Sequence, residues 1–206
     1  MRITGTHLGI LILVMYFAAQ TVDANEIYIN QAGDNINMTI VQDGENNVIS
    51  SLTGNTTKAR ISGNNTSTTF TQTGDDNDIG VYMSAGNGQQ TVTQTGNTNY
   101  AIVDCHGNNC SATIIQNGNN NAANLEFGNG GDYDNTGTIT QDGDYNTAGT
   151  EINGDDNTVV MDQDGDYNSI GGITSAAATG NNNSLSMTQN GNNMTFEGNL
   201  VGSNNS

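Results

Sequence analysis

The sequence has no proline and no tryptophan, and its 206 residues include only two cysteines and three basic residues against 21 acidic ones. The net charge of -18 argues against a nucleic-acid-binding protein, because so acidic a chain would repel phosphates. Apolar residues make up only 33% of the chain, and low hydrophobicity with high net charge is typical of disordered proteins. If the chain folds, its order must therefore come from a repeated pattern.

The one long apolar run lies at the start of the chain. Arg2 and His7 precede an apolar segment at residues 8–19, and small residues follow at 22–24. A charged start, an apolar middle and a small-residue end are typical of a secretory signal peptide, and the run is too short to span a bilayer comfortably. We therefore predict a signal peptide over residues 1–24 and a secreted domain over residues 25–206 that does not span a membrane.

A Gln-x-Gly phrase recurs seven times at steps of 22 to 30 residues, and in six copies an Asn follows five residues after the Gln. The seventh copy has Met194 at the Asn position, and a further Gln-x-Gly at Gln31 belongs to a set of half-repeats. Apolar residues stand two places before each Gln and two places after each Asn position. The recurring residues are Gln42, Gln72, Gln94, Gln116, Gln141, Gln163 and Gln189, with Asn47, Asn77, Asn99, Asn121, Asn146 and Asn168.

Alternation of apolar and polar residues between turns about every 11 residues predicts β-strands. The period near 22 favours a β-solenoid over a meander of hairpins, because only a solenoid stacks residues one full repeat apart. Stacked Gln and Asn side chains can then bond along the stack in ladders, which offsets the cost of burying their amides. We predict an all-β fold, a two-sheeted β-solenoid of strand–arc–strand rungs, with about 22 residues per rung and about eight rungs.

Two details of this solenoid follow from the spacing. The two longest steps predict looped-out residues near 58–65 and 175–181. The strand pattern begins at residues 27–29 and continues to the far end without an obvious cap. Because uncapped repeat stacks and open strand edges recruit further strands, we expect the chain to polymerise with copies of itself.

The repeated phrase resembles the curlin repeat, most closely at residues 94–101 and 141–148. Curlins are secreted bacterial subunits of curli, the surface amyloid fibres of the biofilm matrix. The resemblance implies a solenoid protomer that is exported through the periplasm and an outer-membrane secretion channel to the cell surface. It also implies addition to a growing fimbrium, started by a nucleator subunit, and a role in adhesion.

The chain departs from the curlin pattern in two respects. Curlins carry a second Gln late in each rung, whereas Met83, Cys105, Phe127 and Ile152 stand there and only Gln31 keeps it. The start of the secreted domain also lacks the Gly-rich leader that curlins use for export. These departures leave the export route and the choice between major and nucleating subunit open.

Cys105 and Cys110 bracket a short loop, and counting by twos along the strands places both on the inward side. A disulfide between them is therefore geometrically plausible, and disulfides are common in exported proteins. Free thiols and a metal site with His106 between the two thiolates are the alternatives. The metal site would lack a fourth ligand, so we predict the disulfide and no bound metal.

The sequence carries no recognisable catalytic set. His106 is the only histidine in residues 25–206, so no Ser-His-Asp network is supported, and we expect neither an enzyme nor a cofactor. Two alternatives to a fibre subunit are a monomeric solenoid that presents threonine rows to ice or glycan, and a repeat adhesin. The position before each Gln is not a regular threonine row, because Val41, Ile115 and Asp162 interrupt it.

Overall fold

A computed structural model describes residues 25–27, 29–32, 35, 37–50, 59–62, 65–83, 87–104, 109–126, 134–171, 177–179, 181–197 and 199–205. Within these ranges every regular element is a β-strand. The expected signal peptide over residues 1–24 lies outside the described residues.

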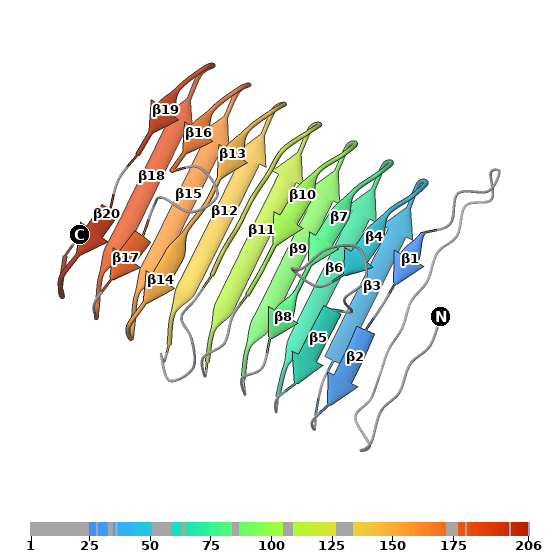
Figure 1. The fold of residues 1–206 in the computed structure, drawn as a ribbon, viewed down its shortest axis with the longest axis horizontal. Helices are drawn as coiled ribbons and strands as arrows, with labels where there is room; N and C mark the ends of the chain where they lie inside the picture. The colour runs from blue at the N-terminus through green and yellow to red at the C-terminus, as the bar shows by residue number, and fades with distance from the viewer. Residues whose placement is uncertain are drawn as a thin grey trace.

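Seven strands of seven residues each form one continuous parallel sheet that runs the length of the molecule (Figure 1). Their order in the sheet follows their order in the chain, and each Gln of the repeat is paired with the next, as Gln116 is with Gln94 and Gln141. The strands are β3 (Asn37–Asp43), β6 (Ser67–Thr73), β9 (Gln89–Thr95), β11 (Ser111–Asn117), β12 (Thr136–Asp142), β15 (Thr158–Asp164) and β18 (Ser184–Asn190).

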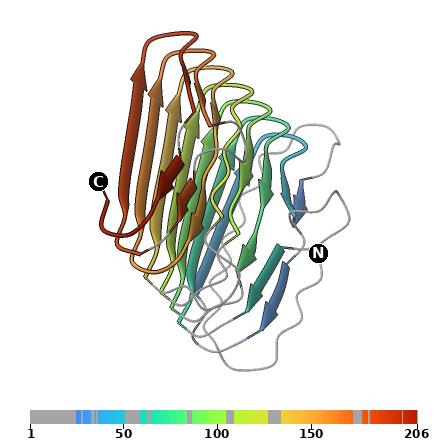
Figure 2. The same ribbon diagram turned by 60° about the vertical axis from the view of Figure 1, so that its left-hand side comes forward.

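The opposite wall of the coil consists of short strands in four smaller parallel sheets (Figure 2). Each coil has a first arc, the turn that follows a long strand, and a second arc, the turn that leads into the next long strand. Beside the first arc lie β1 (Glu26–Ile27), β4 (Val48–Ser50), β7 (Asp78–Gly80) and β10 (Tyr100–Ile102), then β13 (Thr147–Ala148), β16 (Ser169–Ile170) and β19 (Thr195–Phe196). Beside the second arc lie β2 (Ile29–Ala32), β5 (Ala59–Ser62) and β8 (Tyr82–Met83), then β14 (Glu151–Asn153), β17 (Ala177–Thr179) and β20 (Asn199–Val201). The chain is therefore a parallel β-solenoid.

The two-sheet detail of the prediction is not confirmed, because the second wall bends within each coil. Ile79, Gly80 and Val81 are buried in succession, whereas a straight strand buries only alternate residues. The same run of three buried residues recurs at 148–150. Each run marks a corner at which one short strand ends and the next begins.

The predicted rung count and loop positions also differ from the structure. The seven long strands are joined by six complete turns of the coil, so a count of about eight rungs is not confirmed. Strands β5 and β17 each pair in register on both sides, so their residues are not looped out as predicted. Ala59 and Ile61 are fully buried, and this apolar alternation holds β5 in the wall.

The core is a narrow seam between the two walls. Every second residue of the long strands faces it, and the predicted apolar position before the Gln is buried in all seven, with Phe70 the largest side chain there. Each such side chain stabilises the fold by about 1.5–3 kcal/mol. The predicted apolar position after the Asn is also buried, except at Phe196, which is 43% exposed at the last rung.

The first arc of each rung places a glycine two residues after the Gln, where the backbone approaches the next rung closely. Gly118 has a φ of 118°, and a Cβ on it would lie 2.1 Å from the carbonyl oxygen of Gly143. The same contact recurs along the column from Gly44 to Gly165. Glycine is required here both by the positive φ and by the space.

Candidate functional site

The most regular feature of the solenoid is a column of seven buried glutamines beside the first arc. In the first six members the Nε2 donates a hydrogen bond to the Oε1 of the Gln one rung further on, at 2.7–3.0 Å. Each Nε2 also donates to a backbone carbonyl, such as the Tyr100 oxygen for Gln116 at 3.0 Å. The structure thus brings together all seven glutamines singled out in the sequence: Gln42, Gln72, Gln94, Gln116, Gln141, Gln163 and Gln189.

The six recurring asparagines form a second column on the other side of the same arc. The Oδ1 of Asn77 accepts from the backbone N–H of Asn99 at 3.0 Å, and its Nδ2 donates to the Gly96 carbonyl one rung on at 2.8 Å. At the last rung Met194 replaces the Asn and keeps only the backbone bond, to Asn168 Oδ1 at 3.1 Å. The members Asn47, Asn77, Asn99, Asn121, Asn146 and Asn168 are all at most 1% exposed.

The asparagine column begins one rung earlier than the sequence pattern indicated. Asn25 Oδ1 accepts from the Asn47 backbone N–H at 2.8 Å, and Asn25 Nδ2 donates to the Gly44 carbonyl at 3.0 Å. The sequence signal is weak, because Asn25 has an apolar residue two places later, Ile27, but no Gln-x-Gly phrase five residues before it.

A further asparagine column lines the second arc in the C-terminal half. Asn157, Asn183 and Asn205 each donate their backbone N–H to the Oδ1 of the asparagine one rung earlier, at 2.9–3.2 Å. The first member, Asn135, donates its Nδ2 to the Gly154 carbonyl at 2.7 Å. This column is not among the residues predicted from the sequence, although a Gly three residues before the Asn marks three of its members.

The outer edge of the first arc carries a ladder in which aspartate and asparagine alternate irregularly. In each case the Oδ1 accepts the backbone N–H of the preceding rung, at 2.6–2.9 Å. Either residue fits as the acceptor of the backbone N–H, because both side chains carry this oxygen, and Asn119 also donates its Nδ2 to Asp144 Oδ1 at 3.1 Å. This ladder was not predicted from the sequence, and it consists of Asp75, Asn97, Asn119, Asp144, Asp166 and Asn192.

Cys110 is 2% exposed and disulfide-bonded. The only other cysteine in the sequence, Cys105, and the alternative metal ligand His106 lie outside the described residues, so their pairing and geometry stay predictions. Beside Cys110, Gly88 has no room for a side chain, because a Cβ there would lie 2.7 Å from Met83 Sδ and 3.2 Å from Cys110 Sγ. Sulfur atoms thus fill this end of the seam where other rungs place amides.

Across the described ranges, no group of three or more His, Cys, Asp or Glu side chains could hold a metal ion. The same ranges contain no helix of the length and hydrophobicity needed to cross a membrane.

One titratable side chain in the coil has a shifted pKa. Partial burial of Tyr100 and, to a smaller extent, the nearby Asp78 carboxylate raise the pKa of the Tyr100 phenol above its ordinary value of 10.0. The folded state therefore holds this proton more tightly than the unfolded state, so the contribution of Tyr100 to stability is present below pH 10 and lost as pH rises above it.

We expect chemical denaturation to show stability falling above about pH 10. The Tyr100→Phe variant should fall less steeply, and an equal slope would contradict this.

The geometry defines a class of protein, a parallel β-solenoid whose rungs are joined by Gln and Asn ladders. The family model of the curlin associated repeat matches residues 134–165 and 154–191, which contain the copies at Gln141, Gln163 and Gln189. The chain therefore carries the curlin associated repeat over residues 134–191, and the resemblance seen in the sequence is confirmed there. No curated protein and no solved structure matches the chain.

Proposed function

We propose that this chain is a secreted structural subunit that polymerises by edge-to-edge stacking of its rungs into extracellular curli-like amyloid fibres. The observation that carries the proposal is that both ends of the described stack are open. Gln42 is 4% exposed, yet its Oε1 has no hydrogen-bond partner among the described residues, whereas every later Gln of the column accepts from the one before it. This edge can therefore accept one further Gln-bearing strand, whereas a second copy in register meets the stack through the short-strand wall.

The two ends of the described stack support the same conclusion. Strand β3 at one end and β18 at the other each pair on one side only among the described strands. At the β18 end Phe196 and Met194 are 43% and 39% exposed, although the inner members of their columns are buried. Another copy placed at this end would set its Ile27 over Phe196, as Phe196 lies over Ile170. Exposed edges and apolar ends of this kind recruit further chains.

The curlin resemblance extends the proposal to the surroundings of the subunit. A signal peptide over residues 1–24 would direct the chain to the periplasm, and an outer-membrane secretion channel would release it to the cell surface. A nucleator subunit would start the fibre, which would serve adhesion and the biofilm matrix. In the fibre the short strands of the second wall would extend from copy to copy as a second sheet beside the long strands, and the protomer would contribute eight levels along the axis. The ladders described above would hold successive levels in register.

Fibre diffraction on the secreted domain tests this proposal. Residues 25–206 left to stand at high concentration should pellet and give reflections near about 4.7–4.8 Å along the fibre and about 10 Å across it. A chain that stays soluble and folded at all concentrations would overturn the proposal. Electron microscopy of the same samples distinguishes fibres from amorphous precipitate.

Fibre growth should speed up with ionic strength, because the net charge of -18 makes the copies repel one another and salt screens this repulsion. Replacing Asp144 and Asp166 by Asn lowers the charge but keeps the Oδ1 acceptors that bond the neighbouring backbone N–H groups. The double variant should grow faster at low salt and depend less on salt, as measured by light scattering. Identical salt dependence in both proteins would show that repulsion does not limit growth.

A threonine row on the long sheet favours one alternative, a solenoid face that binds ice or glycan. Outward-facing threonines pair in register on five successive strands, followed by Val160 and Ser186. This row stands three residues before each Gln, whereas the row tested in the sequence stands directly before it. The five threonines are Thr39, Thr69, Thr91, Thr113 and Thr138.

Ice-recrystallisation and glycan-binding assays on the soluble chain test this alternative. Substitution of Thr91 by Tyr would roughen the row without touching the core, since Thr91 faces outward. Binding that is present in the native chain and lost in Thr91→Tyr would support the alternative. Absence of binding in the native chain would remove it.

A further inference from the structure

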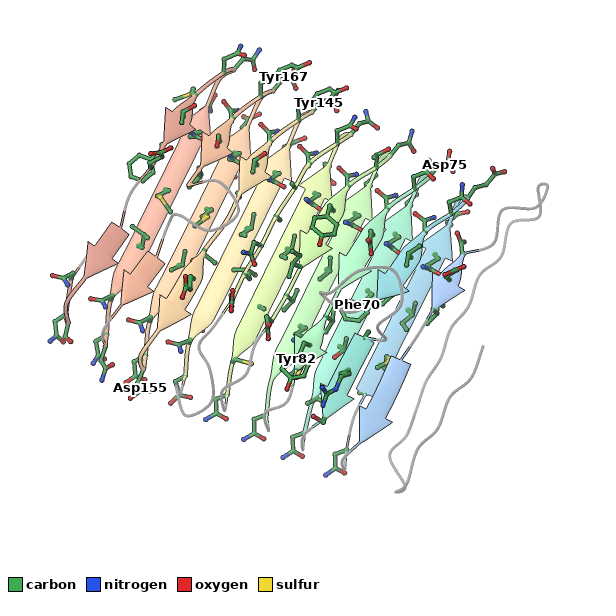
Figure 3. All side chains as sticks on the ribbon, in the orientation of Figure 1. Phe70, Asp75, Tyr82, Tyr145, Asp155 and Tyr167 are labelled. Atoms are coloured by element: carbon green, nitrogen blue, oxygen red, sulfur yellow. The ribbon has the colours of Figure 1, made fainter. Side chains whose placement is uncertain are left out.

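Two tyrosines form a stacked pair on the outer edge of the first arcs (Figure 3). Tyr145 and Tyr167 occupy equivalent positions in neighbouring rungs, and their ring centroids lie 4.8 Å apart with an angle of 4° between the ring planes. The two residues are 48% and 56% exposed, so the rings are open to solvent. Their backbone φ angles are 59° and 58°, which is an unusual conformation for a bulky residue.

The five equivalent positions in the other first arcs carry smaller side chains, and four of them are Asn or Asp, which tolerate this backbone better. They are Asn46, Asp76, Thr98, Asn120 and Asn193. The pair is thus isolated, with Asn120 on one side and Asn193 on the other. Unfavourable backbone conformations that are kept in a fold often mark functional positions. The two tyrosines are therefore candidates for a role that asparagine could not serve.

We propose that Tyr145 and Tyr167 are an oxidative cross-linking site, at which a haem peroxidase with hydrogen peroxide couples the two rings to dityrosine. Each phenol loses one electron and one proton to give a phenoxyl radical. The radicals combine at their ring carbons next to the oxygens, and the two hydrogens on those carbons move to restore the phenols. In total two C–H bonds break, one C–C bond forms, and one peroxide is reduced to two waters.

The geometry selects this pair over the other tyrosines in the described ranges. Tyr100 is partly buried and its neighbours in adjacent rungs are Asp78 and Ala122, so no second ring is in reach. The ring of Tyr82 lies 4.8 Å beneath the Arg60 guanidinium. Since Tyr145 and Tyr167 are held side by side, coupling of the two rings within one chain should be faster than coupling between chains. The product is a covalent link between consecutive rungs.

The test uses the purified full chain in its soluble form, so its outcome does not depend on polymerisation. The chain is treated with peroxidase and hydrogen peroxide, and dityrosine fluorescence is followed. A protease that cleaves before aspartate releases residues 144–154 and 166–206 as separate peptides, each with one of the two tyrosines. We expect these peptides to appear joined, with a mass two hydrogen atoms below their sum.

Variants with phenylalanine provide matched controls, because they keep the ring and remove only the phenol oxygen. Tyr145→Phe and Tyr167→Phe should each lower the fluorescence yield about tenfold, whereas Tyr100→Phe should leave it unchanged. The native chain in concentrated denaturant should lose the selectivity for this pair. Cross-links that join other tyrosines, chain dimers as the main product, or an equal yield in the denatured chain would overturn the proposal. The peptide map of the native chain decides this even if a variant fails to fold.

Discussion

Replacement of Gly118 by alanine is expected to lower the free energy of unfolding by about 3 kcal/mol or more, or to prevent folding altogether. The new Cβ would lie 2.1 Å from the Gly143 carbonyl oxygen, which is a backbone atom and cannot rotate away as the end of a flexible side chain could. The backbone N–H of Gly143 is itself bonded to the Asn117 carbonyl at 2.9 Å, so the arc cannot move away without losing that bond. Equilibrium denaturation of the soluble chain measures the loss.

Gly191→Ala is the matched control for this experiment. Gly191 has a φ of 132°, so alanine is strained there too, but the nearest atom to its Cβ would be Met194 Sδ at 3.5 Å. The difference between the two variants therefore reports the contact between rungs rather than the backbone conformation. Equal destabilisation by both variants would show that the close approach at Gly118 is relaxed at no cost.

Replacement of Gln116 by leucine should cost about 2–4 kcal/mol of stability, because a central member of the ladder has two ladder partners. Gln116 Oε1 accepts from Gln94 Nε2 at 3.0 Å, and Gln116 Nε2 donates to Gln141 Oε1 at 2.9 Å. Leucine fills similar space but leaves the Gln141 oxygen buried without a donor. Thermal or chemical unfolding of the soluble chain measures the effect.

The terminal member of the same column provides the control. Gln42→Leu leaves only one ladder partner unpaired, the Oε1 of Gln72, and it also removes an oxygen that is already buried without a partner. We expect it to cost roughly half as much as Gln116→Leu. Thr113→Val, a substitution on the outward face of β11, the strand that carries Gln116, should change stability by less than about 0.5 kcal/mol. If all three variants had the same effect, the bonds along the column would not be the source of the stability.

The sequence predicts the coil and its register because the period near 22 reports directly which residues stack. Gln42 and Gln72 are 30 residues apart and still pair, so the repeat phrase was a better guide to register than the step length. The step length shows how many extra residues a coil contains, but it does not show where in the coil these residues lie. For that reason β5, whose Ala59 and Ile61 face the core, was wrongly taken as part of a loop.

The missed ladders share a different cause. Asn25 lacks the full Gln-x-Gly phrase that identifies the other copies, because Val22 stands at the glycine position after Gln20, although its contacts are those of any member of the column. On the outer edge, Asp144 and Asn119 differ in charge and look unrelated in a sequence, yet each offers the same Oδ1 to a backbone N–H. Corners such as residues 79–81 were missed because they interrupt the alternation on which strand prediction depends.

The two walls of the described coil hold unequal numbers of levels. The glutamine column has seven members, whereas the column that runs from Asn25 to Met194 has eight, because the coil begins and ends on the short-strand wall. In the proposed fibre, copies that meet flush on that wall would therefore leave a notch one strand wide between β18 of one copy and β3 of the next. The axial repeat would be eight strand spacings, about 38 Å, rather than seven. Such a filament would have one gap per subunit in its long sheet. It would break most easily at this gap, and one foreign strand that carries a Gln could fill it.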